Sequence, residues 1–210
     1  MTEMQPARSC LAIVLAAGEG TRMKSGRPKV LHAVAGRSLL GHALAAVSEA
    51  GADDVAVVIS SERPEVGEEA LRLLPHAQIA IQHERRGTAH AALAAKDALA
   101  SDHHDVIIAF GDTPLVRPET FAALREALSG GAAVAVLGFE AKDPTGYGRL
   151  VEHDGHLEAI VEHKDATPKQ RRAAGGAFQK LPTIQGFRHG IQTTRATPSP
   201  FALLEHFQLA

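Results

Sequence analysis

The chain has 210 residues, which is enough for one sizeable core, and single α/β domains of this length are ordinary. Its formal net charge of -2 argues against a general role on nucleic acids or membrane surfaces, because both would favour a large basic excess. A small-molecule partner is therefore expected. The single cysteine, Cys10, cannot form an internal disulfide, and the apolar run 11–17 is too short to span a bilayer. We expect a cytoplasmic protein.

Short β-branched runs alternate with longer segments of helical spacing. This pattern is typical of an α/β fold in which helices flank a Rossmann-like, mostly parallel sheet. The expected strands are 12–15, 54–59, 78–82, 106–110 and 133–139. The expected helices are 38–50, 65–74, 88–99 and 118–128. Gly51 is placed to end the first helix, and Pro118 suits the first turn of the fourth.

Beyond residue 139 the alternation changes. The segment "GYGRLVEHDGHLEAIVEHKD" predicts two short strands joined by a turn at Asp154 and Gly155. No lasting periodicity follows, and no regular structure is predicted from Ala173 onward. We therefore expect one main α/β domain up to about residue 172, followed by a tail without predicted regular structure.

The stretch "LAAGEGTRMKSGRPKVLH", residues 15–32, follows the first expected strand. Two of its glycines allow a tight turn whose N–H groups point into one concavity, a geometry that favours anions. Its basic residues add charge: Arg22, Lys24, Arg27 and Lys29. The pattern matches neither a P-loop nor the dinucleotide fingerprint. By itself it predicts either a phosphate cradle or a tight turn with solvated basic residues.

The distance along the chain from the glycine-containing loop to Pro28 and Lys29 favours the phosphate-binding interpretation. Five segments occur in order: "LAAGEGTRM" with "PKVLH", "QHERRGTAHA" from Gln82, "FGDTPL" from Phe110, "DPTGYGRLV", and "IVEHKDAT". With these motifs the chain resembles the sugar-nucleotide pyrophosphorylases over about residues 11–172. It is most similar to the uridyltransferase domain of bacterial bifunctional N-acetylglucosamine-1-phosphate uridyltransferases.

The resemblance implies a reaction and its partners. The phosphate of N-acetylglucosamine 1-phosphate would attack the α-phosphorus of UTP, releasing pyrophosphate and forming UDP-N-acetylglucosamine with the help of Mg²⁺. Two polyanions must be brought together, and charge in the in-line transition state must be stabilised. The substrates are thus UTP and the sugar phosphate, with no nucleic acid or membrane partner.

The resemblance also assigns residues. Arg22 and Lys29 become the catalytic cations, and Asp112 becomes the Mg²⁺ ligand at a strand tip. The backbone of the first loop faces the nucleotide: Leu15, Ala16, Ala17 and Gly18. The uracil is read from the second motif: Gln82, Gly87 and Thr88. Phe110 and Gly111 are placed with Asp112 at the substrate, and Gly148 and Glu162 at the sugar.

Structural alternatives stand beside these roles. Asp112 could cap a turn before Pro114, and Glu162 with Lys164 could form a solvated ion pair. The histidines show no spacing typical of metal ligands, and His103 lies in a polar loop, so no zinc site is expected.

The resemblance ends after about residue 172, so it implies a nucleotidyltransferase domain over 1–172 and a divergent tail over 173–210, with the C-terminal part of the fold incomplete. The family continues with an asparagine that holds the sugar and a second that completes the metal site, but Ala177 occupies the first position and the chain contains no asparagine. We expect that the C-terminal part has been replaced. No hexapeptide repeats appear, so acetyl transfer is not expected. The remaining alternatives are an active uridyltransferase, a nucleotide-binding but impaired remnant, and a uridyltransferase for another sugar 1-phosphate; the oligomeric state is not predicted.

Overall fold

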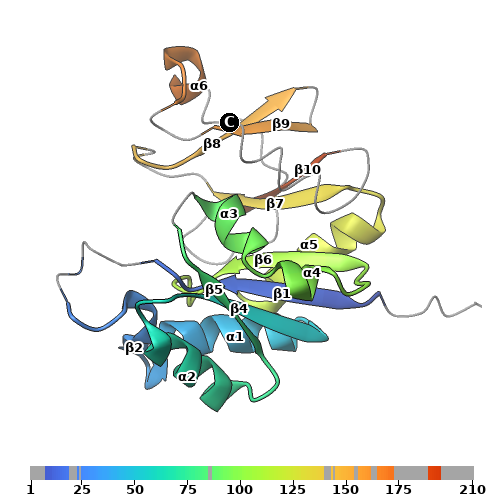
Figure 1. Cartoon of the computed structure of the whole chain (residues 1–210). Helices are drawn as coiled ribbons and strands as arrows, with labels where there is room; N and C mark the ends of the chain where they lie inside the picture. The colour runs from blue at the N-terminus through green and yellow to red at the C-terminus, as the bar shows by residue number, and fades with distance from the viewer. Residues whose placement is uncertain are drawn as a thin grey trace, which may run out of the picture. The chain divides into compact units, whose positions relative to one another are not determined.

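The structure, a computed structural model, describes residues 8–18, 23, 25–84, 87–139, 143, 145–153, 156–161, 165–172 and 189–194. It divides into two compact units, residues 1–122 and 123–210. Each unit is described by itself, with the element labels of Figure 1.

The first unit is built on a four-stranded parallel sheet with the order β5-β4-β1-β6. Its strands are β1 (Cys10–Leu15), β4 (Asp54–Ser60), β5 (Gln78–Gln82) and β6 (Asp105–Phe110). Leu11 pairs with Asp54 on one side of β1, and Cys10 pairs with Asp105 on the other. All four strands predicted for this unit are confirmed, and the α/β fold class with them.

Helices cover both faces of this sheet (Figure 1). α1 (Leu39–Glu49) and α2 (Pro64–Leu73) follow β1 and β4 and lie on one side. α3 (Thr88–Leu93) and α4 (Lys96–Leu99) follow β5 and lie on the other. Right-handed crossovers place the helices in this way. The chain moves along the sheet from β1 to β4 to β5, so α1 and α2 lie on one face. It then returns past β1 to β6, so α3 and α4 lie on the other face.

Local signals set the ends of α1. The Ser38 hydroxyl caps its start by accepting a hydrogen bond from the Gly41 N–H at 3.1 Å. Gly51 follows the helix with φ of 82°, a left-handed conformation that favours glycine, as predicted. The single helix expected over 88–99 is instead broken into α3 and α4. Ala94 and Ala95 make i→i−3 hydrogen bonds to Ala91 and Ala92 at the break, which is a tighter 3₁₀ turn.

Three short elements between β1 and α1 were not predicted. They are the 3₁₀ turn η2 (Lys29–Leu31) and the hairpin strands β2 (Ala33–Val34) and β3 (Arg37–Ser38). Ala35 and Gly36 connect the two strands with φ of 50° and 80°. Two successive positive φ angles are typical of a type I′ turn, the two-residue turn that suits a tight hairpin.

The second unit contains two antiparallel strand pairs. β8 (Arg149–His153) pairs with β9 (His156–Val161), which confirms the predicted hairpin; its turn residues lie outside the described residues. β7 (Val134–Phe139), which was predicted, pairs with β10 (His189–Thr194). β10 falls in the segment for which no regular structure was predicted. The helix α6 (Pro168–Arg172) follows β9, and α5 (Pro118–Ser129) spans the boundary between the units.

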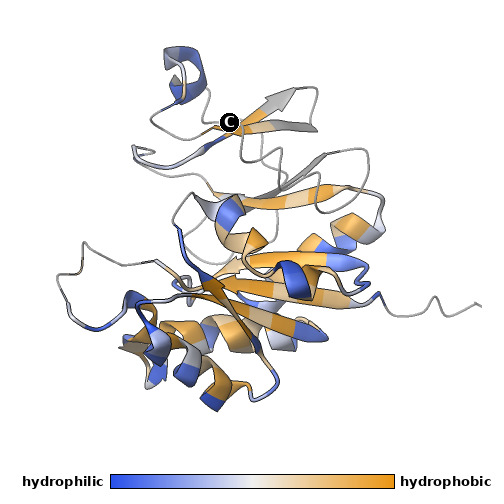
Figure 2. Cartoon of the chain, in the orientation of Figure 1, coloured by the Kyte–Doolittle hydropathy of each residue, from blue (hydrophilic) through white to orange (hydrophobic). Residues whose placement is uncertain are grey.

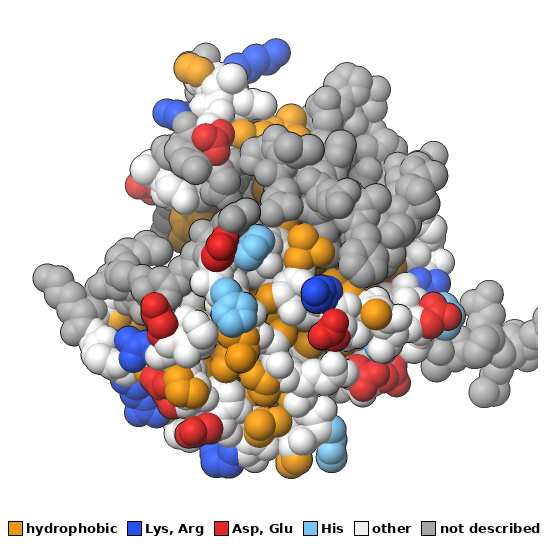
Figure 3. All heavy atoms as spheres, viewed as in Figure 1, with side chains coloured by type: hydrophobic (Ala, Val, Ile, Leu, Met, Phe, Trp, Pro, Cys, Tyr) orange, Lys and Arg blue, Asp and Glu red, His pale blue; other side chains and the backbone are white. Residues whose placement is uncertain are grey.

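The core of the first unit runs along β1 and β4. Leu11, Ile13 and Val57 are fully buried, and Figure 2 shows mainly hydrophobic colours along the middle of these strands. Parallel strands covered on both faces are expected to be apolar throughout. The thiol of Cys10 is buried in this core. In the space-filling view, charged side chains of both signs gather over α2 and β2 (Figure 3). No described helix is long and apolar enough to cross a membrane.

Candidate active site

The candidate site lies where β1 and β6 end beside each other. The Gly111 N–H donates to the Leu15 carbonyl at 2.9 Å, which extends the sheet pairing by one step beyond β6. A Cβ on Gly111 would lie 3.2 Å from that carbonyl oxygen and 3.4 Å from the Ala16 Cβ. The missing side chain therefore allows the two strand ends to approach closely, and it delivers the next residue, Asp112, to this edge of the sheet.

Asp112 and Lys29 meet at this edge. The Lys29 ammonium lies 2.7 Å from Asp112 Oδ2, although 83 positions separate the two residues in the chain. About a third of each side chain is exposed, so the pair is open to a ligand from solvent. The turn η2 positions Lys29, because Val30 and Leu31 are buried and leave the lysine on the outer side. Two residues assigned by separate motifs are thus in direct contact.

The described part of the first loop offers two backbone N–H groups that make no hydrogen bond within the described residues. The Ala16 N–H already donates to the Val58 carbonyl at 2.8 Å, so this amide belongs to the sheet. Within the described residues, the N–H groups of Ala17 and Gly18 make no hydrogen bond. These two amides follow the end of β1 directly and can donate to an anion. Leu15 ends the strand half-buried, and Arg22 lies outside the described residues.

A second group of predicted residues lies at the end of β5. Gln82 is buried, and its Nε2 lies 3.5 Å from Nδ1 of His90 on α3. Gly87 precedes α3 with φ of 105°, and α3 begins at Thr88, as the motif predicted. The ring of His90 thus lies beside the Gln82 amide nitrogen. His90 was not assigned a role from sequence, although it lies within "GTAHA", two positions beyond Thr88.

The remaining predicted residues are distributed over both units. Phe110 ends β6 with 48% of its surface exposed. Gly148 belongs to the second unit, directly before β8, and a Cβ there would approach Ile160 and Val161 at 3.7 Å. Glu162 follows β9 and lies outside the described residues.

Asp112 fits the requirements of a magnesium ligand. Lys29 contacts only one of its carboxylate oxygens, Oδ2, and the other has no partner among the described residues. Mg²⁺ is typically held by one or two carboxylates together with waters and substrate phosphates. The described residues contain no group of three or more His, Cys, Asp or Glu side chains that could hold a metal alone. A metal at Asp112 would therefore depend on phosphate oxygens for most of its coordination.

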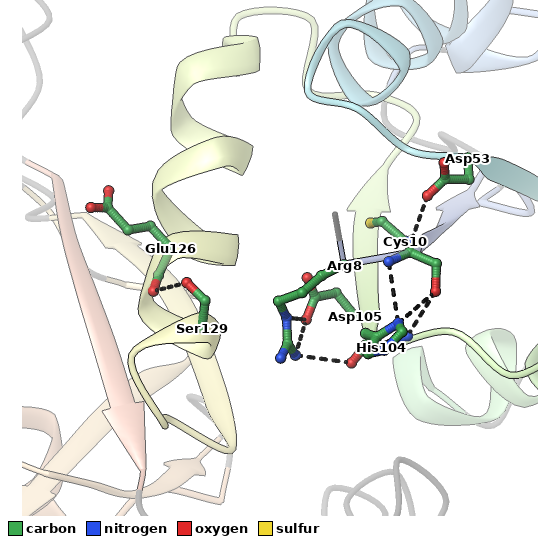
Figure 4. Close-up of polar contacts among 8 residues, drawn as sticks. Arg8, Cys10, Asp53, His104, Asp105, Glu126 and Ser129 are labelled. Atoms are coloured by element: carbon green, nitrogen blue, oxygen red, sulfur yellow. Dashed lines mark hydrogen bonds and ion pairs between the residues drawn. The ribbon is translucent and has the colours of Figure 1, made fainter. Parts of the chain in front are cut away.

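The opposite end of the sheet is closed by polar contacts (Figure 4). The Arg8 guanidinium donates from Nε and Nη2 to Oδ1 of the buried Asp105, at 3.0 and 2.6 Å. This hydrogen bond raises the pKa of Arg8 above its usual value. Asp53 accepts from the Cys10 N–H at 2.8 Å, and the Ser9 hydroxyl lies 2.8 Å from His104 Nδ1. Sequence reasoning missed this network, because its members come from three separate segments.

The same view shows a local contact at the end of α5. The Ser129 hydroxyl donates to the Glu126 carbonyl at 2.8 Å, one helical turn earlier (Figure 4). This contact belongs to the helix and adds nothing to the network of Arg8 and Asp105.

Curated relatives match most of the chain. It is 58% identical over 165 residues to the bifunctional protein GlmU of Azorhizobium caulinodans, covering 79% of this chain and 37% of the relative. Identity to the bifunctional protein GlmU of Rhodopseudomonas palustris is 58% over 161 residues, with 77% and 36% covered. The chain thus spans just over a third of the length of these relatives. The resemblance predicted from the motifs, to the uridyltransferase domain of such proteins, is confirmed.

Solved structures support the fold. The inositol-1-phosphate CTP transferase of T. maritima matches with a TM-score of 0.61 at 20% identity, covering 89% of this chain and 71% of that one. A Bacillus anthracis protein assigned as a glucose-1-phosphate thymidylyltransferase matches with a TM-score of 0.63 at 17% identity, covering 87% and 71%. A family model described as the MobA-like NTP transferase domain matches residues 12–176. This chain, with its parallel sheet and the Lys29–Asp112 pair at the strand ends, therefore belongs to the MobA-like NTP transferase domain family.

Proposed function

We propose that the chain transfers a uridylyl group from UTP to N-acetylglucosamine 1-phosphate, forming UDP-N-acetylglucosamine and pyrophosphate. The observation that supports this most directly is the contact between Lys29 and Asp112 at the edge of the sheet. A cation and a carboxylate at one strand edge suit a reaction between two polyanions. The choice of substrates rests on the similarity to the bifunctional protein GlmU.

The reaction exchanges one phosphorus–oxygen bond for another. A phosphate oxygen of the sugar 1-phosphate attacks the α-phosphorus of UTP, and the bond from that phosphorus to the oxygen bridging to the β-phosphate breaks. The electron pair of the broken bond leaves with pyrophosphate, so no covalent enzyme intermediate is needed. Positioning and charge stabilisation supply the catalysis. Mg²⁺, when bound at Asp112, would neutralise phosphate charge.

The chain's own groups divide this work. The Lys29 ammonium places positive charge at the α-phosphate, and Arg22 is proposed as the second cation. The free N–H groups of Ala17 and Gly18 donate to phosphate oxygens. Asp112 orients Lys29 through their contact.

The nucleobase and the sugar are assigned to other motifs. We assign the uracil edge to Gln82, whose amide is oriented by His90, and to the start of α3 at Gly87 and Thr88. Gly148 and Glu162 are proposed as sugar contacts on the basis of the motifs that contain them.

The test follows pyrophosphate release by the purified protein with UTP, N-acetylglucosamine 1-phosphate and Mg²⁺. Asp112→Asn and Lys29→Gln are expected to lower the rate by roughly a hundredfold or more, the cost of losing one placed charge or donor. Asp102→Asn and Lys96→Gln change the same charges at exposed positions and should leave the rate unchanged.

Two other outcomes of this assay would support one of the alternative functions instead. Binding of UTP without pyrophosphate release would replace the proposal with a nucleotide-binding remnant that lacks turnover. The chain has Ala177 and no asparagine where the resembled family has its sugar-binding residue, and this observation favours that alternative. Release only with a different sugar 1-phosphate would change the substrate but keep the reaction.

A further inference from the structure

A second polar cluster surrounds a cavity in the first unit. The cavity has a volume of about 410 Å³ and lies between η2, the β2–β3 hairpin and α2. We call it the arginine pocket, and its charged lining residues are Arg27, Arg37, Glu69 and Arg72. Arg27 belongs to the basic stretch 15–32, but the resemblance assigns none of the lining residues to the nucleotide, the sugar or the metal. Figure 3 shows side chains of both charges gathered over β2 and α2.

The charges of the arginine pocket do not balance. Glu69 is its only carboxylate among the lining residues, and it accepts hydrogen bonds from Arg72 Nε and from the Ser38 hydroxyl, both at 2.8 Å. The bond from Arg72, and with it that from Ser38, holds the pKa of Glu69 below its usual range. Glu69 is therefore ionised at neutral pH, and its charge is matched by Arg72.

The charges of the other two arginines are left uncompensated. Among the described residues, the guanidinium groups of Arg27 and Arg37 form no hydrogen bond and no ion pair. Arg27 also contributes to the lowered pKa of Glu69, which places its charge near that carboxylate. An oxyanion in the cavity would supply the negative charge that these two lining residues lack.

The fold restrains the stem of Arg37 and the backbone beside Arg27 before any ligand arrives, while both side chains stay exposed to solvent. A Cβ on Gly41 would lie 2.8 Å from Arg37 Cγ, so the stem of Arg37 passes directly over α1. Arg63 donates from Nη1 to the Gly26 carbonyl at 3.1 Å and fixes the turn next to Arg27. Each such restraint lowers the conformational entropy that the arginine loses when it binds an anion.

The size and lining of the cavity indicate the class of ligand. Guanidinium groups bind phosphate with two parallel hydrogen bonds, which makes a phosphate group the best match for two unpaired arginines. The cavity is open to solvent, and its volume exceeds the needs of a free phosphate ion. Leu31 and Leu73 line it beside the polar groups, so it also has room for a compact organic body.

From the two unpaired arginines and the cavity that they line, we propose that the arginine pocket binds a small phosphorylated metabolite of the sugar-phosphate class. Arg27 and Arg37 would hold its phosphate, at a site separate from the nucleotide site.

The experiment is a titration of the isotope-labelled protein with D-glucose 6-phosphate, followed by amide and arginine Nε NMR signals. This probe carries its phosphate on C6 and has no 1-phosphate, so it is not an acceptor in the proposed reaction. The signals expected to shift are those of Gly36, Gly41 and Arg37 Nε. The double variant R27Q/R37Q should raise the dissociation constant by about tenfold or more, because two charge-assisted contacts are lost.

The control variant K96Q/K169Q removes the same charge from exposed sites and should keep the wild-type dissociation constant. Each single variant, R27Q and R37Q, should weaken binding by a smaller factor, with the remaining amide spectrum unchanged as a check of folding. Glucose without phosphate should cause no shift. The proposal is overturned by shifts confined to Ala17, Gly18 and Lys29, by equal shifts with glucose, by the absence of shifts, or by unchanged binding in R27Q/R37Q.

Discussion

At the scale of single residues, Gly111 decides how closely the candidate site is assembled. Its missing side chain lets the end of β6 lie against the Leu15 carbonyl, and Asp112 follows it immediately. A Cβ at 3.2 Å from a backbone oxygen is too close to be accommodated without movement of one strand end. The position of the Asp112 carboxylate thus depends on a residue that has no functional group.

Gly111→Ala tests this dependence. We expect the free energy of unfolding to fall by about 1–3 kcal/mol, the usual cost of overpacking, and pyrophosphate release to fall with it because Asp112 is displaced. Thermal unfolding and the transfer assay measure the two effects. Gly26→Ala is the matched control, since a Cβ there meets nothing within 4 Å. A Gly111→Ala protein with the melting temperature of the wild type would refute the steric argument.

Glu69 predicts a pH dependence of stability. Its pKa is lowered in the folded protein, chiefly by the hydrogen bond from Arg72, so folding favours the ionised form. The stabilisation is complete above the pKa of an unfolded glutamate, about 4.3, and is lost as the pH falls through the lower folded value. The difference in melting temperature between wild type and Glu69→Gln should therefore be present at pH 7 and shrink in acid. A difference that grew in acid would contradict the sign.

Among the elements, α1 has the clearest single determinant. The Ser38 hydroxyl accepts from the Gly41 N–H and donates to Glu69, so it joins the start of α1 to α2. Ser38→Ala should lower the free energy of unfolding by about 1 kcal/mol for the lost cap. Thermal unfolding measures the change, with the exposed Ser61→Ala as control. Equal melting temperatures for the two variants would show that the cap does not stabilise the helix.

Elements that bury a continuous apolar segment could be predicted from the sequence. The bounds of four strands agree with the expected positions within one or two residues: β1, β4, β5 and β6. Short runs of buried β-branched residues favour a strand over other secondary structure. The hairpin β2–β3 was missed because strands of two residues show no periodicity. β10 was missed because its partner β7 lies some fifty residues earlier, and such pairing leaves no local signal.

The candidate site was predictable only in part, for a related reason. The motifs and the resemblance assigned both Lys29 and Asp112 to the same site. In the structure, Lys29 Nζ lies 2.7 Å from Asp112 Oδ2. The contact between Gln82 and His90, and the shared hydrogen bonds of Ser38, Glu69 and Arg72, depend on how separate elements pack. No periodicity or turn signal encodes such contacts, so they appear only once the fold is known.

For the molecule as a whole, the two units predict unequal local stability. β1 and β4 each pair on both sides within a buried sheet, whereas β8 and β9 form a two-stranded hairpin. Hydrogen exchange followed by mass spectrometry should therefore find the slowest amides in β1 and β4 and faster exchange in β8 and β9. β5, at an edge of the same sheet, provides an internal comparison. Equal protection of the hairpin and β1 would contradict this expectation.

The network of Arg8, Asp105, Asp53 and His104 closes one end of the parallel sheet, while Lys29 and Asp112 leave the other end accessible. This division separates two kinds of evolutionary constraint on the same strands. At the accessible end, changes of the partly exposed Lys29 and Asp112 side chains are expected to affect the proposed reaction before they affect the fold, whereas Gly111 is needed there for packing. Changes at the end closed by Arg8 and Asp105 endanger the fold first. New substrate specificities are therefore expected to arise almost entirely at the accessible end.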